Sequence, residues 1–184
     1  MVKKYYSGIG SRHTPPEIME TMKQIASRLE DMGYILRSGG ATGADSAFES
    51  GIKDHANMQV FLPFDGFNDK YSAVGYISKY SEINVDNAHN SVIHFHPVGK
   101  ALKGKSYKFM ARNFFQVCGL EGENNSEFII CWTPDGATTK TTRNTGGTGQ
   151  AIRIANFLEI PVYNLKNIHS NIDHFLGKIT KLNM

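Results

Sequence analysis

The chain has 184 residues, of which 40% are hydrophobic and 20% are charged, and its formal net charge is +3. This composition is typical of one globular domain and excludes a disordered, collagen-like or disulfide-rich chain. No apolar run is long enough to cross a bilayer, and the first residues lack a signal-like apolar core, so we expect a cytoplasmic protein with no membrane partner. The net charge is too small to establish a polyanion partner by itself.

The first predicted elements are a strand and a long helix. Residues 5–9 form a short aromatic and β-branched run, which predicts a strand. The helix is predicted to begin at Pro15, with Thr14 as its N-cap and Glu17 completing a capping box, and to end at Gly33. Its apolar residues recur every three or four positions, which is typical of an amphipathic helix.

The alternation of strands and helices continues and then breaks. We predict a strand at residues 34–37, a helix at 44–54 and a strand at 60–62. Residues 65–104 are polar, rich in aromatic side chains and irregular. We therefore expect an insertion or lid over about residues 65–104, with a helix near residues 85–95.

The second half of the chain returns to the regular pattern. We predict, in order, a helix at residues 107–117, a strand at 128–132, a polar loop at 133–145, a helix at 149–158, a short strand at 162–163 and a terminal helix at 168–182. Strands that alternate with helices of this length predict one α/β domain over residues 1–184, with a parallel sheet and crossover helices. The terminal helix is amphipathic, so it suits either docking on its own chain or an interface between subunits.

A glycine-rich turn follows the second predicted strand. Its candidates for contact with a phosphate or a sugar are Ser38, Gly39, Gly40, Thr42, Gly43 and Asp45. Glycines let a ligand approach the backbone, and the N-terminus of the following helix offers unpaired N–H groups to an anion. The alternative is a tight strand-to-helix turn whose glycines serve packing alone.

Two further turns repeat this chemistry after the first and fourth strands. They add seven residues to the candidate site, namely Gly10, Ser11, Arg12, Gly146, Gly147, Thr148 and Gly149. Arg12 carries a fixed, fork-shaped charge that suits a phosphate, although it could also form a surface ion pair. Ligands of parallel sheets bind beyond the carboxyl ends of the strands, so these turns predict a nucleotide-binding cleft at one edge. They form neither a full dinucleotide fingerprint nor a P-loop.

Four short motifs of the chain resemble those of the DprA/Smf proteins and occur in the same order, at residues 8–12, 37–45, 111–113 and 146–149. These proteins belong to the wider SLOG superfamily. The chain is especially similar to stand-alone DprA-like proteins of tailed phages, which would place it in the host cytoplasm. The resemblance implies a Rossmann-like fold and adds Arg112 and Asn113 to the candidate site. In DprA relatives these positions line a pocket for the phosphates of single-stranded DNA, whereas in LOG relatives the equivalent cleft hydrolyses the N-glycosidic bond of a nucleoside monophosphate.

One departure from the family pattern bears on hydrolysis. The resemblance implies a threonine and a glutamate in the second glycine motif, where this chain has Gln150 and Arg153. A cation can neither act as a general base nor stabilise an oxocarbenium-like sugar, so we assign no catalytic residue. A carboxylate could still come from Asp45, Glu49 or Asp135, so enzymatic activity stays open, with nucleoside monophosphate N-glycosidase as the reaction to test. We expect no separate cofactor.

Other residues suit positions around such a cleft. Trp132 closes a strand at the ligand edge and is the best candidate to stack on a base, and residues 65–68 are expected to border the cleft. Basic residues crowd positions 100–112, which is either a solvated helix face or a strip that faces phosphates.

Histidines and cysteines give weaker signals. His89, His94 and His96 lie close together in sequence without a nearby cysteine, so we predict no metal site. Cys118 and Cys131 lie far apart in apolar surroundings, so we expect free, buried thiols.

These patterns together predict a protein that holds a phosphate-bearing small nucleotide in a glycine-loop cleft. The first alternative is binding of single-stranded DNA, as in the DprA proteins, and the second is a hydrolase of the LOG type. Members of the superfamily often oligomerise, so we expect a homo-oligomer.

Overall fold

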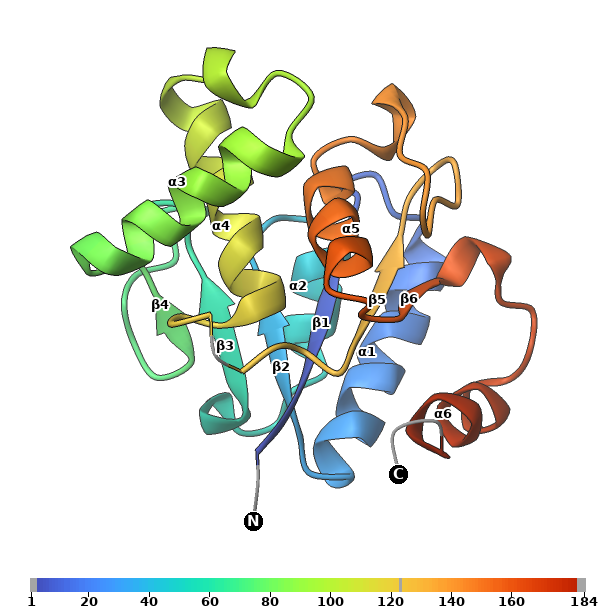
Figure 1. Ribbon diagram of the computed structural model, residues 1–184. Coiled ribbons are helices and arrows are strands. Elements are labelled where there is room, and N and C mark those ends of the chain that lie inside the picture. Colours follow the sequence, from blue (N-terminus) through green and yellow to red (C-terminus); the bar gives the residue numbers. More distant parts are fainter. Residues whose placement is uncertain (1–2, 123, 182–184) are drawn as a thin grey trace.

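The computed structural model describes residues 3–122 and 124–181, which form a six-stranded sheet with helices on both faces (Figure 1). The strands are β1 (Lys4–Gly10), β2 (Tyr34–Ser38), β3 (Met58–Phe61), β4 (Tyr76–Ile77), β5 (Phe128–Trp132) and β6 (Val162–Asn164). All neighbouring strands pair in parallel, in the order β4-β3-β2-β1-β5-β6. The predicted α/β fold with a Rossmann-like parallel sheet is confirmed.

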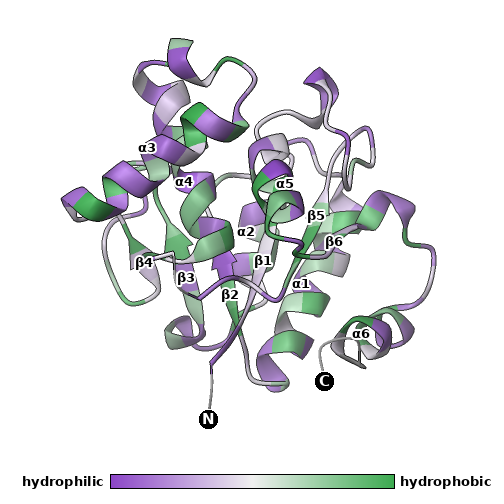
Figure 2. Ribbon diagram, in the orientation of Figure 1, coloured by the Kyte–Doolittle hydropathy of each residue, from purple (hydrophilic) through white to green (hydrophobic). Residues whose placement is uncertain are grey.

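The helices cover the sheet from two sides. They are α1 (Pro16–Asp31), α2 (Ala44–Ser50), α3 (Glu82–Phe95), α4 (Gly104–Cys118), α5 (Thr148–Phe157) and α6 (Ile172–Lys181). Helices α1 and α2 pack on one face with α6 beside them, and α4 and α5 pack on the other face with α3 against them. Figure 2 shows hydrophobic residues along β3 and β5, whereas hydrophobic and polar residues alternate along α3.

Consecutive residues of β5 supply both cores. Phe128 and Ile130 pack toward the α1 side, whereas Ile129 and Cys131 pack toward the α5 side. A strand that alternates between two buried faces must be apolar throughout, which explains the unbroken hydrophobic run in its sequence. The ring of Phe128 lies 6.0 Å from the ring of Tyr6 and 5.4 Å from that of Tyr34.

The strand order changes direction at β1. Strands β2 and β3 lie on one side of β1, and β5 and β6 lie on the other. The turns that follow β1, β2 and β5 therefore meet at the carboxyl edge of the sheet. In open α/β sheets a ligand binds at such a switch point.

The start of α1 differs from the prediction. Pro15 is the N-cap and makes no side-chain capping bond, so the predicted capping box of Thr14 and Glu17 is wrong. The Thr14 hydroxyl donates instead to the carbonyl oxygen of Ser11 at 2.7 Å. This bond stabilises the turn after β1. Gly33 ends the helix as predicted, with a left-handed φ of 82°.

The middle segment is more regular than predicted. Helix α3 begins at Glu82, and its N-cap Ser81 forms a capping box. The edge strand β4 comes earlier in the segment and has two residues, Tyr76 and Ile77. A two-residue strand is too short to produce a periodic signal in the sequence. Helix α2 ends at Ser50, four residues before the predicted end at residue 54. Gly51, its C-cap, passes close to α1, and a Cβ there would lie 2.2 Å from the carbonyl oxygen of Lys23.

The terminal helix docks on its own chain. Phe175, Leu176 and Ile179 are buried in the core on the α1 side, and Asp173 pairs with Arg28 of α1 at 3.4 Å. The predicted end of this helix at residue 182 lies outside the described residues.

The prediction of free, buried thiols is confirmed, because Cys118 and Cys131 are both free and buried.

Within residues 3–122 and 124–181, no helix is long and apolar enough to span a membrane.

Replacing Phe128 by alanine should lower the free energy of unfolding by about 3–5 kcal/mol, because a fully buried ring in a cluster of aromatic residues is deleted. Urea denaturation followed by circular dichroism measures this difference. Phe157→Ala is the matched control, since that ring is 65% exposed and its loss should cost less than about 1 kcal/mol. Equal effects at the two positions would contradict the assignment of the core.

Candidate nucleotide-binding cleft

A cavity of about 410 Å³ lies at the carboxyl edge of the sheet, where the turn after β1 faces α4 and the start of α5. It is lined by ten of the residues that the sequence nominated, namely Gly10, Ser11, Arg12, Thr42, Asp45, Arg112, Asn113, Gly146, Gly147 and Thr148. The three turns and the α4 motif, which are spread over more than 130 positions of the sequence, therefore meet in one place. A volume of this size is typical of a small-ligand site.

The other nominated residues lie behind the cavity wall. Ser38, Gly39, Gly40, Gly43, Trp132 and Gly149 are not among the lining residues. Trp132, predicted to stack on a base, packs instead against the core on the α1 side. Ser38 is completely buried, and its hydroxyl has no hydrogen-bond partner among the described residues.

The first glycine turn is satisfied by the protein's own side chains. The N–H of Gly40 donates to Oε1 of Glu49 at 3.0 Å, and the N–H of Ala41 donates to Oδ2 of Asp45 at 3.3 Å. The carbonyl oxygen of Gly39 accepts a bond from Nη1 of Arg112. Because two backbone N–H groups already face carboxylates, this turn is not an open cradle for a phosphate.

Two glycines of this turn are required by close approach. A Cβ at Gly39 would lie 2.5 Å from both Nη1 of Arg112 and Nε2 of Gln116. A Cβ at Gly43 would lie 2.6 Å from the carbonyl oxygen of Ser11, and its φ of 80° also favours glycine. The glycines thus bring the turn after β2 against α4 and against the turn after β1.

Four charged side chains surround this turn. Asp45 and Glu49 are buried, and they face Arg112 at 3.9 Å and Lys70 at 2.5 Å respectively. Burial raises the pKa of Asp45, although the charge of Arg112 and the N–H of Ala41 oppose this shift. Burial likewise raises the pKa of Glu49 to about 7, against the opposing charge of Lys70. The charges of these four groups compensate one another, so the first glycine turn offers little net attraction to an anion.

The second glycine turn has the opposite character. Gly147 is the N-cap of α5 and makes no side-chain capping bond, and the first turn of the helix carries no acidic residue. The first N–H groups of a helix lack partners within the helix, and its dipole favours an anion there. The side chain of Asn113 donates to the carbonyl oxygen of Gly147 at 2.8 Å and holds this helix start beside α4.

Arg12 supplies a cation to the same cavity. Its side chain is exposed, and it takes part in no ion pair among the residues that the structure describes. Within that part of the chain, the surface ion pair considered from the sequence is not formed. The N–H groups of Gly149 and Gln150 already donate to the carbonyl oxygens of Gly146 and Gly147, at 3.1 and 3.3 Å, so the attraction for an anion comes from Arg12 and the dipole of α5.

A hydrogen-bond network shapes the loop that leads to α5. Asp135 accepts bonds from the hydroxyls of Thr133 at 2.9 Å, Thr142 at 2.8 Å and Thr145 at 2.6 Å. Partial burial raises the pKa of this carboxyl, but these bonds and the N–H of Ala137 outweigh it and lower the pKa to about 2. The threonines of this loop thus serve to position the start of α5.

Gln150 and Arg153, the residues that depart from the LOG pattern, act in packing. Nη1 of Arg153 donates to Oγ1 of Thr141 at 2.7 Å, and its Nε donates to the carbonyl oxygen of Phe95 at 2.5 Å. Nε2 of Gln150 donates to the carbonyl oxygen of Ser91 at 3.2 Å. Both side chains therefore join α5 to α3, and neither lines the cavity.

Some cavity residues were not nominated from the sequence. Gln116 and Phe109 line the cavity from α4, four residues after and three residues before Arg112. That spacing places all three on one face of the helix and could have identified them. Phe67 and Asn68 also line the cavity, in agreement with the prediction for residues 65–68.

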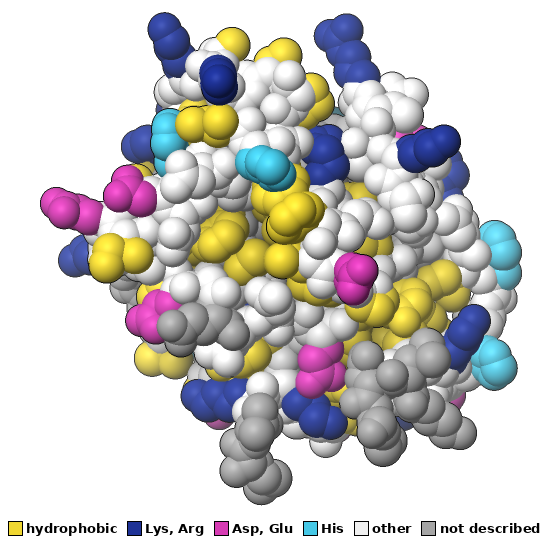
Figure 3. All heavy atoms as spheres, in the orientation of Figure 1, with side chains coloured by type: hydrophobic (Ala, Val, Ile, Leu, Met, Phe, Trp, Pro, Cys, Tyr) yellow, Lys and Arg dark blue, Asp and Glu magenta, His cyan; other side chains and the backbone are white. Residues whose placement is uncertain are grey.

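The basic segment at residues 100–112 divides in two. The side chain of Arg112 lies at the cavity and is 11% exposed, whereas Lys100, Lys103, Lys105 and Lys108 are exposed. Lys and Arg side chains stand out along the upper edge of the molecule, where the strands end (Figure 3).

Lysines and aromatic rings lie together beside the cavity. The ammonium groups of Lys105 and Lys108 each lie 5.9 Å from the ring of Phe64. That ring contacts Phe67 and Phe109, which belong to the cavity wall. A mixed cationic and aromatic surface therefore continues from the cavity over α4.

The histidines form no metal site. Within the described part of the chain, no group of three or more histidine, cysteine, aspartate or glutamate side chains could hold an ion. Nδ1 of His89 lies 2.7 Å from the hydroxyl of Tyr107, and His94 packs on the rings of Phe95 and Phe157.

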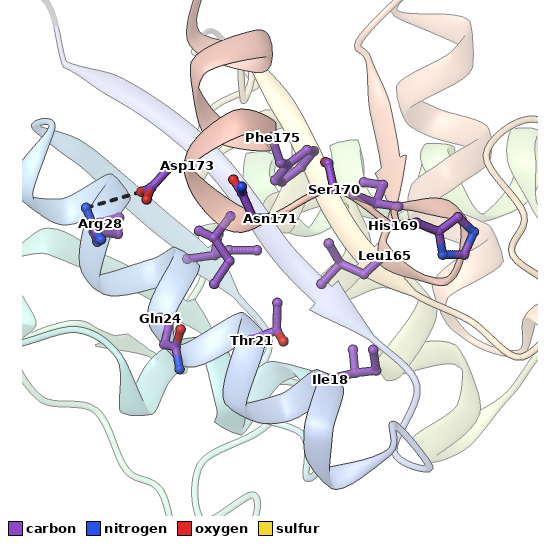
Figure 4. Close-up of a pocket in the computed structure, with 13 residues that line it drawn as sticks. Ile18, Thr21, Gln24, Arg28, Leu165, His169, Ser170, Asn171, Asp173 and Phe175 are labelled. Atoms are coloured by element: carbon purple, nitrogen blue, oxygen red, sulfur yellow. Dashed lines mark ion pairs between the residues drawn. The ribbon is translucent and has the colours of Figure 1, made fainter.

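A second cavity, of about 470 Å³, lies between α1 and the segment that leads into α6 (Figure 4). Ile18, Leu165 and Phe175 give it apolar walls. Its charged residues Arg28 and Asp173 pair with each other. None of the nominated residues lines it, so we assign the candidate site to the first cavity.

Of three comparisons with known proteins, the one with solved structures found a similar fold. No family model matches the chain, and neither does any curated protein. Among solved structures, DNA processing protein A from Helicobacter pylori, studied for its mode of binding single-stranded DNA, matches with a TM-score of 0.59 at 19% identity, over 97% of this chain and 80% of that chain. The chain has a DprA-like fold. The likeness at this identity concerns the fold, and the cleft is assigned from its own geometry.

The carboxyl of Asp135 should titrate with a midpoint near pH 2, below its usual value of 3.8, because three hydroxyls and an N–H stabilise the charged form. The pKa is lower in the folded state, so the network contributes fully at pH values above the usual pKa and is lost as the pH falls through 2. Carbon-detected NMR of the side-chain carboxyl measures the midpoint. A value near 4 would mean that the network does not form.

Proposed function

We propose that this protein binds single-stranded DNA and holds one nucleotide of the strand in the cavity between the turn after β1 and the start of α5. The observation that carries the proposal is that Arg12, which forms no ion pair within the described part of the chain, lines the same cavity as the N-terminus of α5, which has no capping side chain. Both groups attract a phosphate.

Other residues of the cavity suit the base of that nucleotide. Asp45 lines the cavity as a buried carboxyl, which repels a phosphate but accepts a bond from an amino group of a base. Phe67 and Phe109 add apolar ring surface to the lining. The cavity therefore offers complementary chemistry to the phosphate and to the base.

The surface beyond the cavity supports a strand over an isolated nucleotide. Lys105, Lys108 and Phe64 continue outward from the cavity wall, and single-stranded nucleic acid is bound by such alternation of cations and aromatic rings. The fold match to DNA processing protein A, whose study concerns single-stranded DNA binding, supports the same choice. We also propose that the chain belongs to the SLOG superfamily and to its phage-type branch. This part of the proposal is supported by the order of the four motifs at residues 8–12, 37–45, 111–113 and 146–149.

Fluorescence anisotropy with a labelled oligothymidylate tests the proposal. Binding should weaken steeply as salt rises, because phosphate contacts release counterions. A duplex of the same length should bind more weakly, since its bases cannot reach the aromatic surface. No binding at low salt, or binding that does not respond to salt, would overturn the proposal.

Arg12→Ala should weaken oligonucleotide binding about tenfold and reduce the slope of log K against log salt by about 1, because one phosphate contact is lost. Arg28→Ala is the matched control, since Arg28 lies at the second cavity and pairs with Asp173. It should leave affinity and slope unchanged. If only the Arg28 variant loses affinity, the DNA binds at the other cavity.

The second candidate function is capture of a small nucleotide, favoured by the size of the cavity and by the buried Asp45. Competition separates the two functions. A mononucleotide that displaces the oligonucleotide at micromolar concentration would favour a small ligand, whereas a strand-binding site should need millimolar competitor. Native mass spectrometry of the purified protein would identify any nucleotide that it retains.

The remaining expectations concern hydrolysis and assembly. The hydrolase alternative has no carboxylate at Arg153, and that side chain packs on α3, so we do not propose it further. The expected homo-oligomer remains a prediction that light scattering can test.

A further inference from the structure

The segment at residues 64–72 forms one wall of the cavity. It leaves β3 and returns to the edge strand β4, and it places Phe67 and Asn68 at the cavity surface. The ring of Phe67 lies 5.9 Å from the guanidinium carbon of Arg112. The position of this segment therefore sets how wide the cavity is on the α4 side.

Two side chains tie this wall to the first glycine turn. Nζ of Lys70 donates to Oε2 of Glu49 at 2.5 Å and to the carbonyl oxygen of Gly40 at 3.2 Å. Nδ2 of Asn68 donates to the same carbonyl oxygen at 2.9 Å. Glu49 also accepts the N–H of Gly40, so the wall and the turn share one buried polar cluster.

The wall contains a tight turn next to these contacts. Asn68 has a φ of 50° and Asp69 has a φ of 59°, which are left-handed values that Asn and Asp tolerate better than other residues with a Cβ. The contacts made by the side chains of Asn68 and Lys70 hold this turn against the first glycine turn.

From these contacts we propose that the Lys70–Glu49 ion pair is a latch, which holds residues 64–72 against the glycine turn and whose release widens the cavity. The proposal rests on the proposed function for the role of the cavity, although the latch itself is a property of the free protein. Glu49 does not line the cavity, so it acts by positioning the wall and does not contact the ligand.

Four charged or titratable groups interact with the carboxyl of Glu49 and determine how strongly its charge is compensated. Lys70 comes from the wall, Asp45 from the same helix, Arg112 from α4 and Tyr76 from β4. Lys70 makes the direct contact with Glu49 and is its main source of compensation. Removing that cation leaves a buried carboxylate without its partner, which disfavours the closed wall.

Hydrogen exchange of the free protein tests the latch. Backbone N–H groups of the wall are protected by the bonds of Gly66 to Lys70 and of Lys70 to Phe67, at 2.9 and 3.1 Å. In Lys70→Met, exchange of peptides covering residues 64–72 should be roughly tenfold faster than in the wild type at pH 8, which is about 1.4 kcal/mol. Peptides from β1 and β5 should not change, and neither should the wall in Asp31→Asn, which breaks an exposed ion pair of similar length with Lys53.

The pH dependence separates the charge pair from simple loss of packing. The pKa of Glu49 in the closed wall is raised to about 7, so its carboxyl becomes protonated as the pH falls and the missing cation then matters less. The ratio of exchange rates between Lys70→Met and the wild type should therefore shrink toward pH 6. A packing effect would keep the ratio constant.

A second variant keeps the test decisive if the single substitution unfolds the chain. In the Glu49→Gln background, Lys70→Met should change exchange of the wall by less than about threefold, because no charge remains to be paired. Unchanged exchange in Lys70→Met at pH 8 would overturn the latch. A full effect of Lys70→Met in the Glu49→Gln background would overturn it as well. Neither result depends on whether DNA binds, so the latch and the proposed function can fail separately.

Discussion

The candidate site depends on the burial of Arg112 between α4 and the turn after β2. Its guanidinium donates to the carbonyl oxygen of Gly39 and faces the carboxylate of Asp45 at 3.9 Å. Burial lowers the pKa of this guanidinium, and Asp45 opposes that shift. A buried charge is retained at acceptable cost when a partner and hydrogen bonds compensate it, so Arg112, Asp45 and Gly39 must be kept together. This contact brings α4, and with it Asn113, to the carboxyl edge of the sheet.

The two glycine turns have different roles in this arrangement. The first turn offers its N–H groups to Asp45 and Glu49 and its carbonyl oxygens to Arg112, Asn68 and Lys70. Its polar groups are thus used to assemble the cavity wall. The second turn begins a helix without a capping side chain and lines the same cavity as Arg12, so we assign the capacity to hold an anion to these two groups. Similar sequence patterns therefore have different roles because their surroundings differ.

The sequence predicted the architecture well because its signals are local. The apolar run at residues 128–132 is buried on both faces, and helices alternate with strands at the spacing of parallel sheets. Signals failed where the structure depends on contacts between distant segments. Thr14 bonds to Ser11 instead of capping α1, and β4 is too short to show a period.

The same distinction applies to the site. Motifs at strand ends identified eight cavity residues, since topology brings those ends to one edge, and the family resemblance added Arg112 and Asn113. The sequence did not reveal that the first turn is occupied by Glu49 and Lys70, because the two are 21 positions apart and meet only through the fold. Nor did it reveal that Trp132 packs into the core on the α1 side.

The most direct test of the central claim is NMR mapping of the backbone N–H groups while a short single-stranded oligonucleotide is added. The account predicts that the largest shifts occur at residues 146–148, at the turn that contains Arg12, and on the adjoining surface of α4, with little change at α1 and α6. Shifts concentrated at the cavity between α1 and α6, or no shifts at all, would contradict it.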